Sequence, residues 1–350
     1  MSDIVNNAYT SEAASDVSQS NHWSKQREKA SGWQLNFLLF LFKIFPVFIL
    51  RIIAFPVGFF YFLFSRKARF ESKRFLKRAA QFIEDPKLAE KCASPFAPLK
   101  HIISFSLTLI EKTQGWGGRF PLKNIHFNND DIYNLIDELD NGKGAFLVFS
   151  HLGNSELLRS FLNSDKTGVS RKVPATAIMD VNVTAHFVKM LKKLNPQSSV
   201  DIICTDDIGP QTAILLEERL SSGGVVLIAG DRTSASGNAN IMLPFFGKEA
   251  PFHSGVFYLL SLIKYPVYFV FGLRSGCLSL KSRYNMYVHK SDISFDCPRK
   301  ERIQRSNDMA LVFVSLLESY CKKFPFQWFN FFDFWQEGDT QGGTQNEKKK

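Results

Sequence analysis

The chain has 350 residues, a length that suits one large domain or two small ones, and a formal net charge of +10 with a pI near 9.3. The positive excess indicates acidic partners: anionic lipid headgroups, an acidic carrier protein and nucleic acid are all compatible with it. Five scattered cysteines without a Cys-x-x-Cys pair argue against a disulfide framework and a zinc site, and no metal or other cofactor is expected.

The first part of the chain contains a long apolar segment. Residues 1–22 are polar and are predicted to form a flexible tail, without the basic start and apolar centre of a secretory signal peptide. Residues 23–78 are predicted to form a membrane-associating helical segment, because the apolar run 35–64 exceeds the about 20 residues that a bilayer span needs. Lys43, Arg51 and two prolines interrupt this run. They favour a helical hairpin that dips into one leaflet, or a tilted interfacial helix pair, over a lone span.

A basic run follows the apolar segment directly. Between Arg66 and Arg78 there are seven Lys or Arg side chains and a single acid, Glu71. A run of charge is usually only a solvated face. Beside an apolar membrane segment, however, the positive-inside rule and the attraction of anionic lipids favour the cytoplasmic surface of a membrane. Nucleic-acid binding has only this basic run in its favour and is not expected.

β-type and helical patterns alternate through the rest of the chain without a clear linker. This alternation is typical of an α/β fold. We expect a single domain over 79–335, with a central mixed, mostly parallel sheet flanked by helices, and a polar flexible tail over 336–350. The expected strands are 144–149, 173–179, 200–204, 225–229, 267–272 and 284–289. The expected helices are 99–112, 130–140, 184–194, 211–221, 255–264 and 299–323, with a loop at 115–118.

The most informative local pattern is the hexapeptide His-Leu-Gly-Asn-Ser-Glu at 151–156, directly behind an apolar run. Positions five apart on a helix lie about 140° apart, so His151 and Glu156 cannot share one helical face. A loop that holds the His, followed by a helix start that holds the Glu, brings them together, with Asn154 or Ser155 as the helix cap. A carboxylate-oriented imidazole can take a proton from a hydroxyl. The alternative is a strand-end histidine bonded to backbone and a first-turn acid that suits the helix dipole.

A second acid follows a later predicted strand. Asp231 and Arg232 come just after 225–229. In open α/β sheets, ligand sites gather beyond the carboxyl ends of the strands. If 144–149 and 225–229 are parallel neighbours, His151 and Asp231 face one cleft, where Arg232 can bind a phosphate or carboxylate through its planar fork of donors. The alternative is a structural ion pair at a strand end.

Two further features narrow the chemistry. The sequence Leu-Pro-Phe-Phe-Gly at 243–247 indicates an apolar turn, whose Phe245, Phe246 and Gly247 form either buried packing or the wall of an acyl-chain tunnel. The chain lacks a Gly-x-Ser-x-Gly elbow, a Gly-x-Gly-x-x-Gly loop, a Walker motif and a His-Glu-x-x-His motif. A serine esterase, a dinucleotide enzyme, a P-loop NTPase and a zincin are therefore disfavoured.

Taken in order, these features resemble the lysophospholipid acyltransferase superfamily, and within it the bacterial lipid A late acyltransferases (lauroyl and myristoyl acyltransferases). The matching elements are the apolar segment with its basic run, the His-x4-Glu pattern at 151–156, Asp231 after a later strand, Pro-Phe-Phe-Gly at 244–247 and Pro-x-Gln-Trp at 325–328. They cover residues 33–335. Ser155 replaces the Trp often found before the acid, and Arg232 is not the usual neighbour of the Asp. The chain looks closest to a stand-alone subgroup linked to aryl-polyene-type pigment pathways.

The resemblance implies acyl transfer from an acyl thioester, on acyl carrier protein or coenzyme A, to a hydroxyl of a lipid-like acceptor at the cytoplasmic face of the cell inner membrane. In that mechanism His151 is the general base, and Glu156 or Asp231 orients it. A backbone N–H near the helix start, or Arg232, stabilises the oxyanion. The hydroxyl attacks the thioester directly, without an acyl-enzyme. The residues expected to bind substrate are Asn154, Asp231, Arg232, Phe245, Phe246 and Gly247.

Two other functions stay open. A metal-dependent hydrolase would use His151, Glu156 and Asp231 with His186 or His253, although these positions lack the tight spacing of common ligand sets. A non-catalytic lipid-binding or scaffold protein on the membrane would keep the fold without the chemistry.

Overall fold

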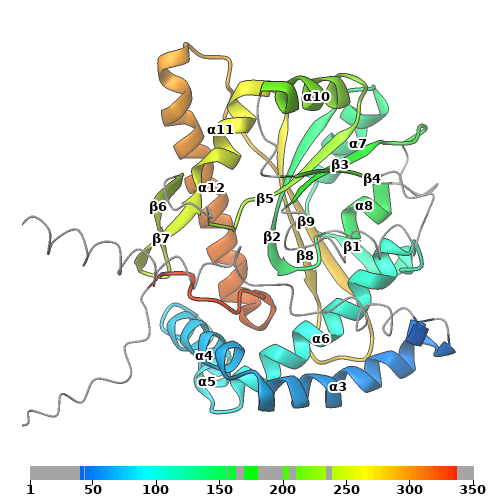
Figure 1. The fold of residues 1–350 in the computed structure, drawn as a ribbon, viewed down its shortest axis with the longest axis vertical. Helices are drawn as coiled ribbons and strands as arrows, with labels where there is room; N and C mark the ends of the chain where they lie inside the picture. Colours follow the sequence, from blue (N-terminus) through cyan, green and yellow to red (C-terminus); the bar gives the residue numbers. More distant parts are fainter. Residues whose placement is uncertain are drawn as a thin grey trace, which may run out of the picture.

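The computed structural model describes residues 40–42, 44–155, 157–162, 169–179, 200–204, 210–233 and 239–336. Its strands are β1 (Ile125–Phe127), β2 (Ala145–Gly153), β3 (Ala175–Met179), β4 (Val200–Cys204), β5 (Val225–Ala229), β6 (Asn240–Phe245), β7 (Lys248–His253), β8 (Val267–Arg274) and β9 (Tyr284–Lys290). Seven of them form a central sheet in the order β1-β9-β8-β2-β5-β3-β4 (Figure 1). Only β8 and β9 pair antiparallel within it, so the predicted mixed, mostly parallel sheet is confirmed.

Helices cover both faces of this sheet. They are α3 (Val47–Phe64), α4 (Arg66–Ala80), α5 (Pro86–Ala93), α6 (Ala97–Trp116), α7 (Asp131–Asp140), α8 (Leu157–Leu162), α10 (Pro210–Ser221), α11 (Ser254–Ile263) and α12 (Arg302–Lys323), with short 3-10 turns η2 (Leu122–Asn124), η4 (Arg299–Glu301) and η5 (Pro325–Gln327). The α/β architecture predicted from the alternating pattern is therefore present.

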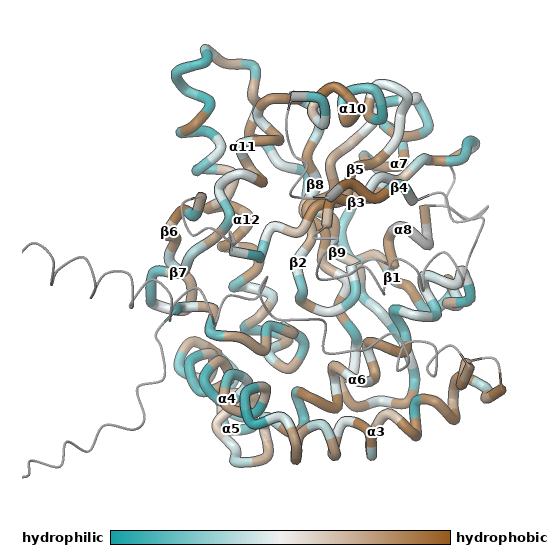
Figure 2. Tube along the Cα trace, viewed as in Figure 1, coloured by the Kyte–Doolittle hydropathy of each residue, from teal (hydrophilic) through white to brown (hydrophobic). Residues whose placement is uncertain are grey.

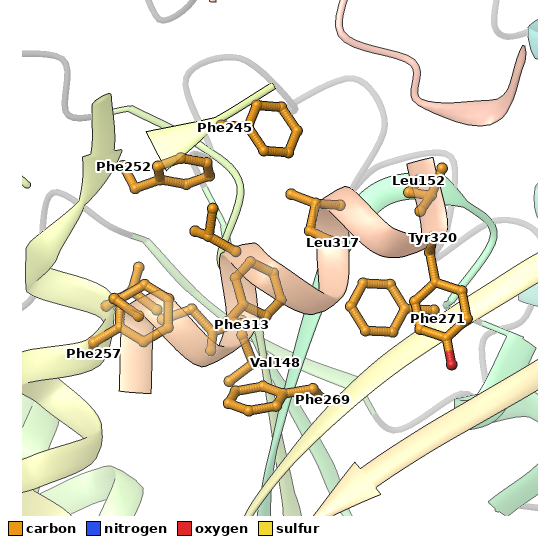
Figure 3. Packing of buried hydrophobic residues seen from close by; sticks show 14 of the residues in the cluster. Val148, Leu152, Phe245, Phe252, Phe257, Phe269, Phe271, Phe313, Leu317 and Tyr320 are labelled. Atoms are coloured by element: carbon orange, nitrogen blue, oxygen red, sulfur yellow. The ribbon is translucent and has the colours of Figure 1, made fainter. Parts of the chain in front are cut away.

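Strand β2 lies in the middle of the sheet and is buried on both faces. Alternate side chains of a strand point to opposite faces. Phe146 and Val148 pack towards α11 and α12, and Leu147 packs towards α7 on the other face. Figure 3 shows Val148 and Phe313 of α12 together in this core. Burial on both faces explains why β2 reads as an unbroken apolar run.

The helices α3, α4 and α6 lie together at one edge of the molecule, the lower edge in Figure 1. Helix α3 starts after Pro46 and packs along α6. In the described part of the chain, α3 is the one helix that is long and apolar enough to cross a membrane, judged by length and composition. The length and composition of α3 thus support the predicted membrane association of this segment, without showing its orientation or the side of the membrane. Lys43 lies outside the described residues.

The structure corrects several predicted boundaries. Helix α6 continues through Gly115 and Trp116, where a loop was predicted. The segment 243–247 is more than the predicted turn, since β6 and β7 form an antiparallel hairpin around it. Prolines such as Pro244 disfavour strands, so the sequence gives little sign of this hairpin. Its turn residues Phe246 and Gly247 have φ of 51° and 71°, the pattern of a type I′ turn. The predicted helix 184–194 and both predicted tails lie outside the described residues, Gln336 excepted.

Candidate active site

His151 lies within β2, and this corrects the prediction of a loop. The strand continues past the predicted end to Gly153, and its register against β8 shifts between Phe149 and Gly153. A register shift of this kind bends a strand and re-aims its side chains. Gly153 has φ of 71°, and a Cβ on it would come within 2.1 Å of the carbonyl oxygen of Gly272. The end of β2 therefore requires glycine at this position.

Asp231 reaches His151 from the neighbouring strand. Strands β2 and β5 are parallel, with Phe149 opposite Ala229, so the residues two positions further along meet at the same edge of the sheet. The Nδ1 atom of His151 lies 2.8 Å from Oδ1 of Asp231, and the backbone N–H of His151 donates to Oδ2 at 2.7 Å. The predicted condition, that the two strands are parallel neighbours, is met.

The segment after α12 completes the surroundings of this carboxylate. Trp328 donates its indole N–H to Oδ2 of Asp231 at 3.1 Å and forms a β-bridge with Leu152. The backbone N–H of Phe329 donates to the carbonyl oxygen of His151 at 3.0 Å. The Asp231 side chain is fully buried, so both of its oxygens are held by hydrogen bonds rather than by water.

The electrostatics favour a neutral imidazole beside an ionised carboxylate. Burial, with a smaller contribution from the charge of Arg232, holds the pKa of His151 below its ordinary value, although Asp231 acts to raise it. Burial alone would raise the pKa of Asp231, but the attraction and hydrogen bonds of His151 and the charge of Arg232 together hold that pKa below its usual range. A neutral His151 that donates Nδ1–H to Asp231 leaves the Nε2 lone pair as the acceptor. The side chain is 26% exposed, so a substrate hydroxyl can reach it.

The charges of two cations act on the imidazole. The guanidinium of Arg232 donates to Oδ1 of Asn330 at 3.2 Å and lies over the ring of Phe332, 5.4 Å from its centre. Lys112, on α6, also lowers the pKa of His151 through its charge. Positive charge of this kind attracts an anionic group of a substrate, or negative charge that develops on an oxygen.

Asn154 and Ser155 do not have the predicted capping role for their side chains. The hydroxyl of Ser155 donates to the carbonyl oxygen of Val270 at 3.1 Å and accepts from the N–H of Gly272 at 3.2 Å, which fixes the turn against β8. The Asn154 side chain is buried, and among the described residues neither its Oδ1 nor its Nδ2 has a hydrogen-bond partner. It is thus a buried polar group, three residues after His151, whose hydrogen-bonding capacity the described residues do not satisfy. Glu156 lies outside the described residues.

The predicted acyl-tunnel residues form a packed aromatic cluster. Phe245 and Phe246 are buried, and the ring of Phe245 lies 5.2 Å from that of Trp328. A Cβ on Gly247 would come within 2.4 Å of the ring of Phe82. Phe245 therefore packs against Trp328, which in turn donates to Asp231. Figure 3 shows Phe245 beside Phe252.

Among the described residues, no group of three or more His, Cys, Asp or Glu side chains is close enough to hold a metal ion. His253 caps α11, where its Nδ1 accepts from the N–H of Gly255 at 3.0 Å. His186 and Glu156 lie outside the described residues.

Trp328, Asn330 and Lys112 were not predicted as site residues. Trp328 was noted only as part of the Pro-x-Gln-Trp pattern. Each lies far from His151 along the chain, and no local spacing connects them. A buried Trp usually needs a hydrogen-bond acceptor for its indole N–H. This need is the one sequence signal for the contact of Trp328 with Asp231. In comparisons of the sequence, no family model and no curated protein matches it.

Proposed function

We propose that the protein is a membrane-associated O-acyltransferase. It moves a fatty-acyl group from an acyl thioester to a hydroxyl of a lipid-like acceptor. The observation that carries the proposal is the 2.8 Å contact between Nδ1 of His151 and Oδ1 of the fully buried Asp231. A partly exposed histidine that is oriented by a carboxylate is the arrangement that activates a hydroxyl.

In the proposed reaction, Nε2 of His151 takes the proton of the acceptor hydroxyl while the oxygen attacks the thioester carbonyl carbon. Asp231 holds the imidazole in the required tautomer and stabilises the imidazolium that forms. The tetrahedral oxyanion then collapses, the C–S bond breaks, and the thiolate takes the proton back from Nε2. The products are an ester and a free thiol, and His151 returns to its neutral state.

Substrate binding falls to the polar groups around this pair. Arg232 and Lys112 are the candidates to stabilise the oxyanion, and the amide of Asn154 lies buried three residues after His151. Acyl carrier proteins are strongly acidic and complement the net charge of +10. We therefore propose acyl carrier protein, or else coenzyme A, as the donor and the cytoplasmic face of the inner membrane as the location.

The test is mass spectrometry of the lipid and pigment extract from a deletion strain complemented with wild type, His151→Ala or His126→Ala. His126 is exposed, so its substitution is the matched control. We expect one species to lose a single fatty-acyl mass in the deletion and in His151→Ala, and to return with wild type and with His126→Ala. Full restoration by His151→Ala would contradict catalysis by this residue and favour the scaffold function. Loss of activity on treatment with a chelator would favour the hydrolase.

A further inference from the structure

Helix α3 presents an apolar face to solvent. Leu50, Ala54 and Gly58, spaced four apart, are buried on the side that meets α6. The opposite side carries large apolar side chains whose exposed fractions run from 43% for Phe59 to 83% for Phe64. The exposed residues of this face are Phe48, Ile52, Val57, Phe59, Phe60, Leu63 and Phe64. Figure 2 shows α3 as a hydrophobic stretch along the edge of the molecule. A continuous apolar face of this kind marks an interaction surface.

Helix α3 is held on α6 along its length. Near its start, Arg51 donates to Oε1 of Gln114 at 3.1 Å and lies 3.6 Å from Oε1 of Glu111. Further along, Gly58 approaches α6 so closely that a Cβ on it would lie 3.1 Å from the Cα of Ile103. Arg51, the charge that argued against a lone span in the sequence, is therefore paired with Glu111 and Gln114 of α6.

Helix α6 is in turn fixed to the sheet domain. Glu111 is fully buried and accepts from Nε and Nη2 of Arg274 at 2.9 Å and 3.0 Å. At the other end of α6, the Nε2 atom of His101 lies 3.0 Å from the carbonyl oxygen of Trp328. For α3 to cross a bilayer alone it would have to leave α6, which would separate Arg51 from Glu111 and expose the buried side of α3. The contacts favour a helix that stays on the domain surface.

A basic stripe continues from this apolar face onto α4. Arg66, Lys73 and Lys77 are exposed and lie on one side of α4, since positions seven and eleven residues apart nearly coincide around a helix. None of the three forms an ion pair with another described residue. Arg69, by contrast, donates to the carbonyl oxygens of Phe62 and Leu63 in α3, which fixes the start of α4 against the end of α3.

We propose that α3 and α4 together form a docking surface for an anionic phospholipid bilayer, with α3 in the plane of the membrane instead of across it. The outer face of α3 enters the acyl-chain region, and the basic stripe of α4 meets the headgroups. This inference deepens the membrane attachment in the proposed function. Binding to vesicles is measured without turnover, so its failure would leave the acyl-transfer proposal untouched.

The first test asks whether α3 must leave α6 in order to bind lipid. A Cβ on Gly58 lies 3.0 Å from Oγ of Ser106, so the double variant Gly58→Cys/Ser106→Cys places two thiols together between the helices for a disulfide, with Ile103 displaced by a few tenths of an ångström. We expect the full-length oxidised protein and its reduced form to float equally with phosphatidylcholine–phosphatidylglycerol vesicles. Binding by the reduced form alone would show that α3 leaves the domain, and would overturn the in-plane arrangement.

The second test separates the charge from the apolar face. We expect Lys73→Gln/Lys77→Gln to weaken binding to phosphatidylglycerol-containing vesicles by roughly tenfold or more, because each basic side chain near an anionic surface contributes about fivefold. Binding to pure phosphatidylcholine vesicles should not change. The matched control is Arg299→Gln/Lys300→Gln, which removes two exposed charges before α12, far from α4 (Figure 1). Equal losses from both pairs would contradict a lipid-facing stripe.

The third test addresses the apolar face. We expect Phe60→Ser/Phe64→Ser to abolish flotation with both kinds of vesicle. The control, Tyr133→Ser/Ile214→Ser, removes two large side chains of comparable exposure, at 67% and 71%, that lie on α7 and α10. Unchanged flotation of the Phe60/Phe64 variant would exclude α3 as the membrane-facing element.

Discussion

At the scale of single residues, the carboxylate of Asp231 does two things at once. Its Oδ1 contacts the imidazole of His151, and its Oδ2 accepts from the backbone N–H of the same residue. The side chain and main chain of His151 are thus held by one group. Because the contact depends on two neighbouring strands in register, it fixes the orientation of the base without help from a mobile loop.

The protonation of His151 predicts the pH profile. A base works only when it is neutral, and the pKa of His151 is lowered, chiefly by burial and then by Arg232. Activity should therefore be full at neutral pH and fall only as the pH drops below the ordinary histidine value of about 6.5. Arg232→Gln removes a cation that lowers this pKa, so its acid limb should move to higher pH. The measurement is kcat/KM for thioester consumption as a function of pH, made on the wild type and on Arg232→Gln. An acid limb that moves to lower pH in Arg232→Gln would contradict this electrostatic account.

Trp328 is predicted to act through Asp231 as a positioning residue. Trp328→Phe removes the indole N–H that donates to Oδ2 at 3.1 Å but keeps an aromatic ring. A hydrogen bond to a charged group contributes about 1.5–3 kcal/mol, so we expect kcat to fall by roughly 10-fold to 100-fold with little change in KM. Trp335→Phe is the control, because its indole donates to the carbonyl oxygen of Phe245 instead. Equal effects of the two substitutions would mean that only packing is lost.

At the scale of elements, the sequence predicted the sheet better than the site. Central strands such as β5 were predicted because burial on both faces gives apolar runs. The site depends on pairings between distant segments. The sequence predicted that Asp231 and His151 share one cleft only if their two strands are parallel neighbours. Strand order depends on distant segments, so the local sequence does not give it. The contact of Trp328 with Asp231 was not foreseen at all, because it joins positions 97 apart.

The end of β2 provides a prediction about an element. Gly153→Ala places a Cβ within 2.1 Å of a backbone oxygen of β8 and also forces a non-glycine residue to φ of 71°. Gly142→Ala has a similar φ of 78° but no atom within 4 Å of the added Cβ. Gly142→Ala should therefore cost only the backbone strain, about 1–2 kcal/mol. Gly153→Ala should cost more in thermal unfolding and should also remove activity. Equal stability losses would show that β2 can shift to relieve the clash.

At the scale of the whole molecule, a chain of ion pairs, hydrogen bonds and one peptide link joins helix α3 to the proposed base. Arg51 of α3 contacts Glu111 of α6, which pairs with Arg274 of β8. The backbone N–H and carbonyl oxygen of Arg274 each bond the side chain of Gln327 at 2.8 Å. The next residue along the chain, Trp328, donates to Asp231. The segment after α12 therefore connects two buried polar clusters that lie on different elements.

Glu111 contacts Arg51, Arg274 and Tyr284, so we expect its substitution to affect both stability and activity. Glu111→Gln keeps an acceptor for the hydroxyl of Tyr284 but leaves Arg274, which is fully buried, without a counter-charge. Breaking a buried pair in this way costs about 3–5 kcal/mol. Glu138→Gln is the matched control, since Glu138 also accepts from a tyrosine, Tyr268, but pairs with the half-exposed Lys290.

Thermal unfolding of the two variants in one detergent provides the comparison. We expect Glu138→Gln to remain within about 1 kcal/mol of wild type, because partly exposed pairs contribute little. Glu111→Gln should unfold at clearly lower temperature. It should also have a lower kcat, because Arg274, the partner of Glu111, holds Gln327 next to Trp328. A variant of Glu111 that is destabilised yet fully active at low temperature would show that the cluster holds the fold together without positioning Asp231. Membrane attachment and catalysis would then depend on separate parts of the chain.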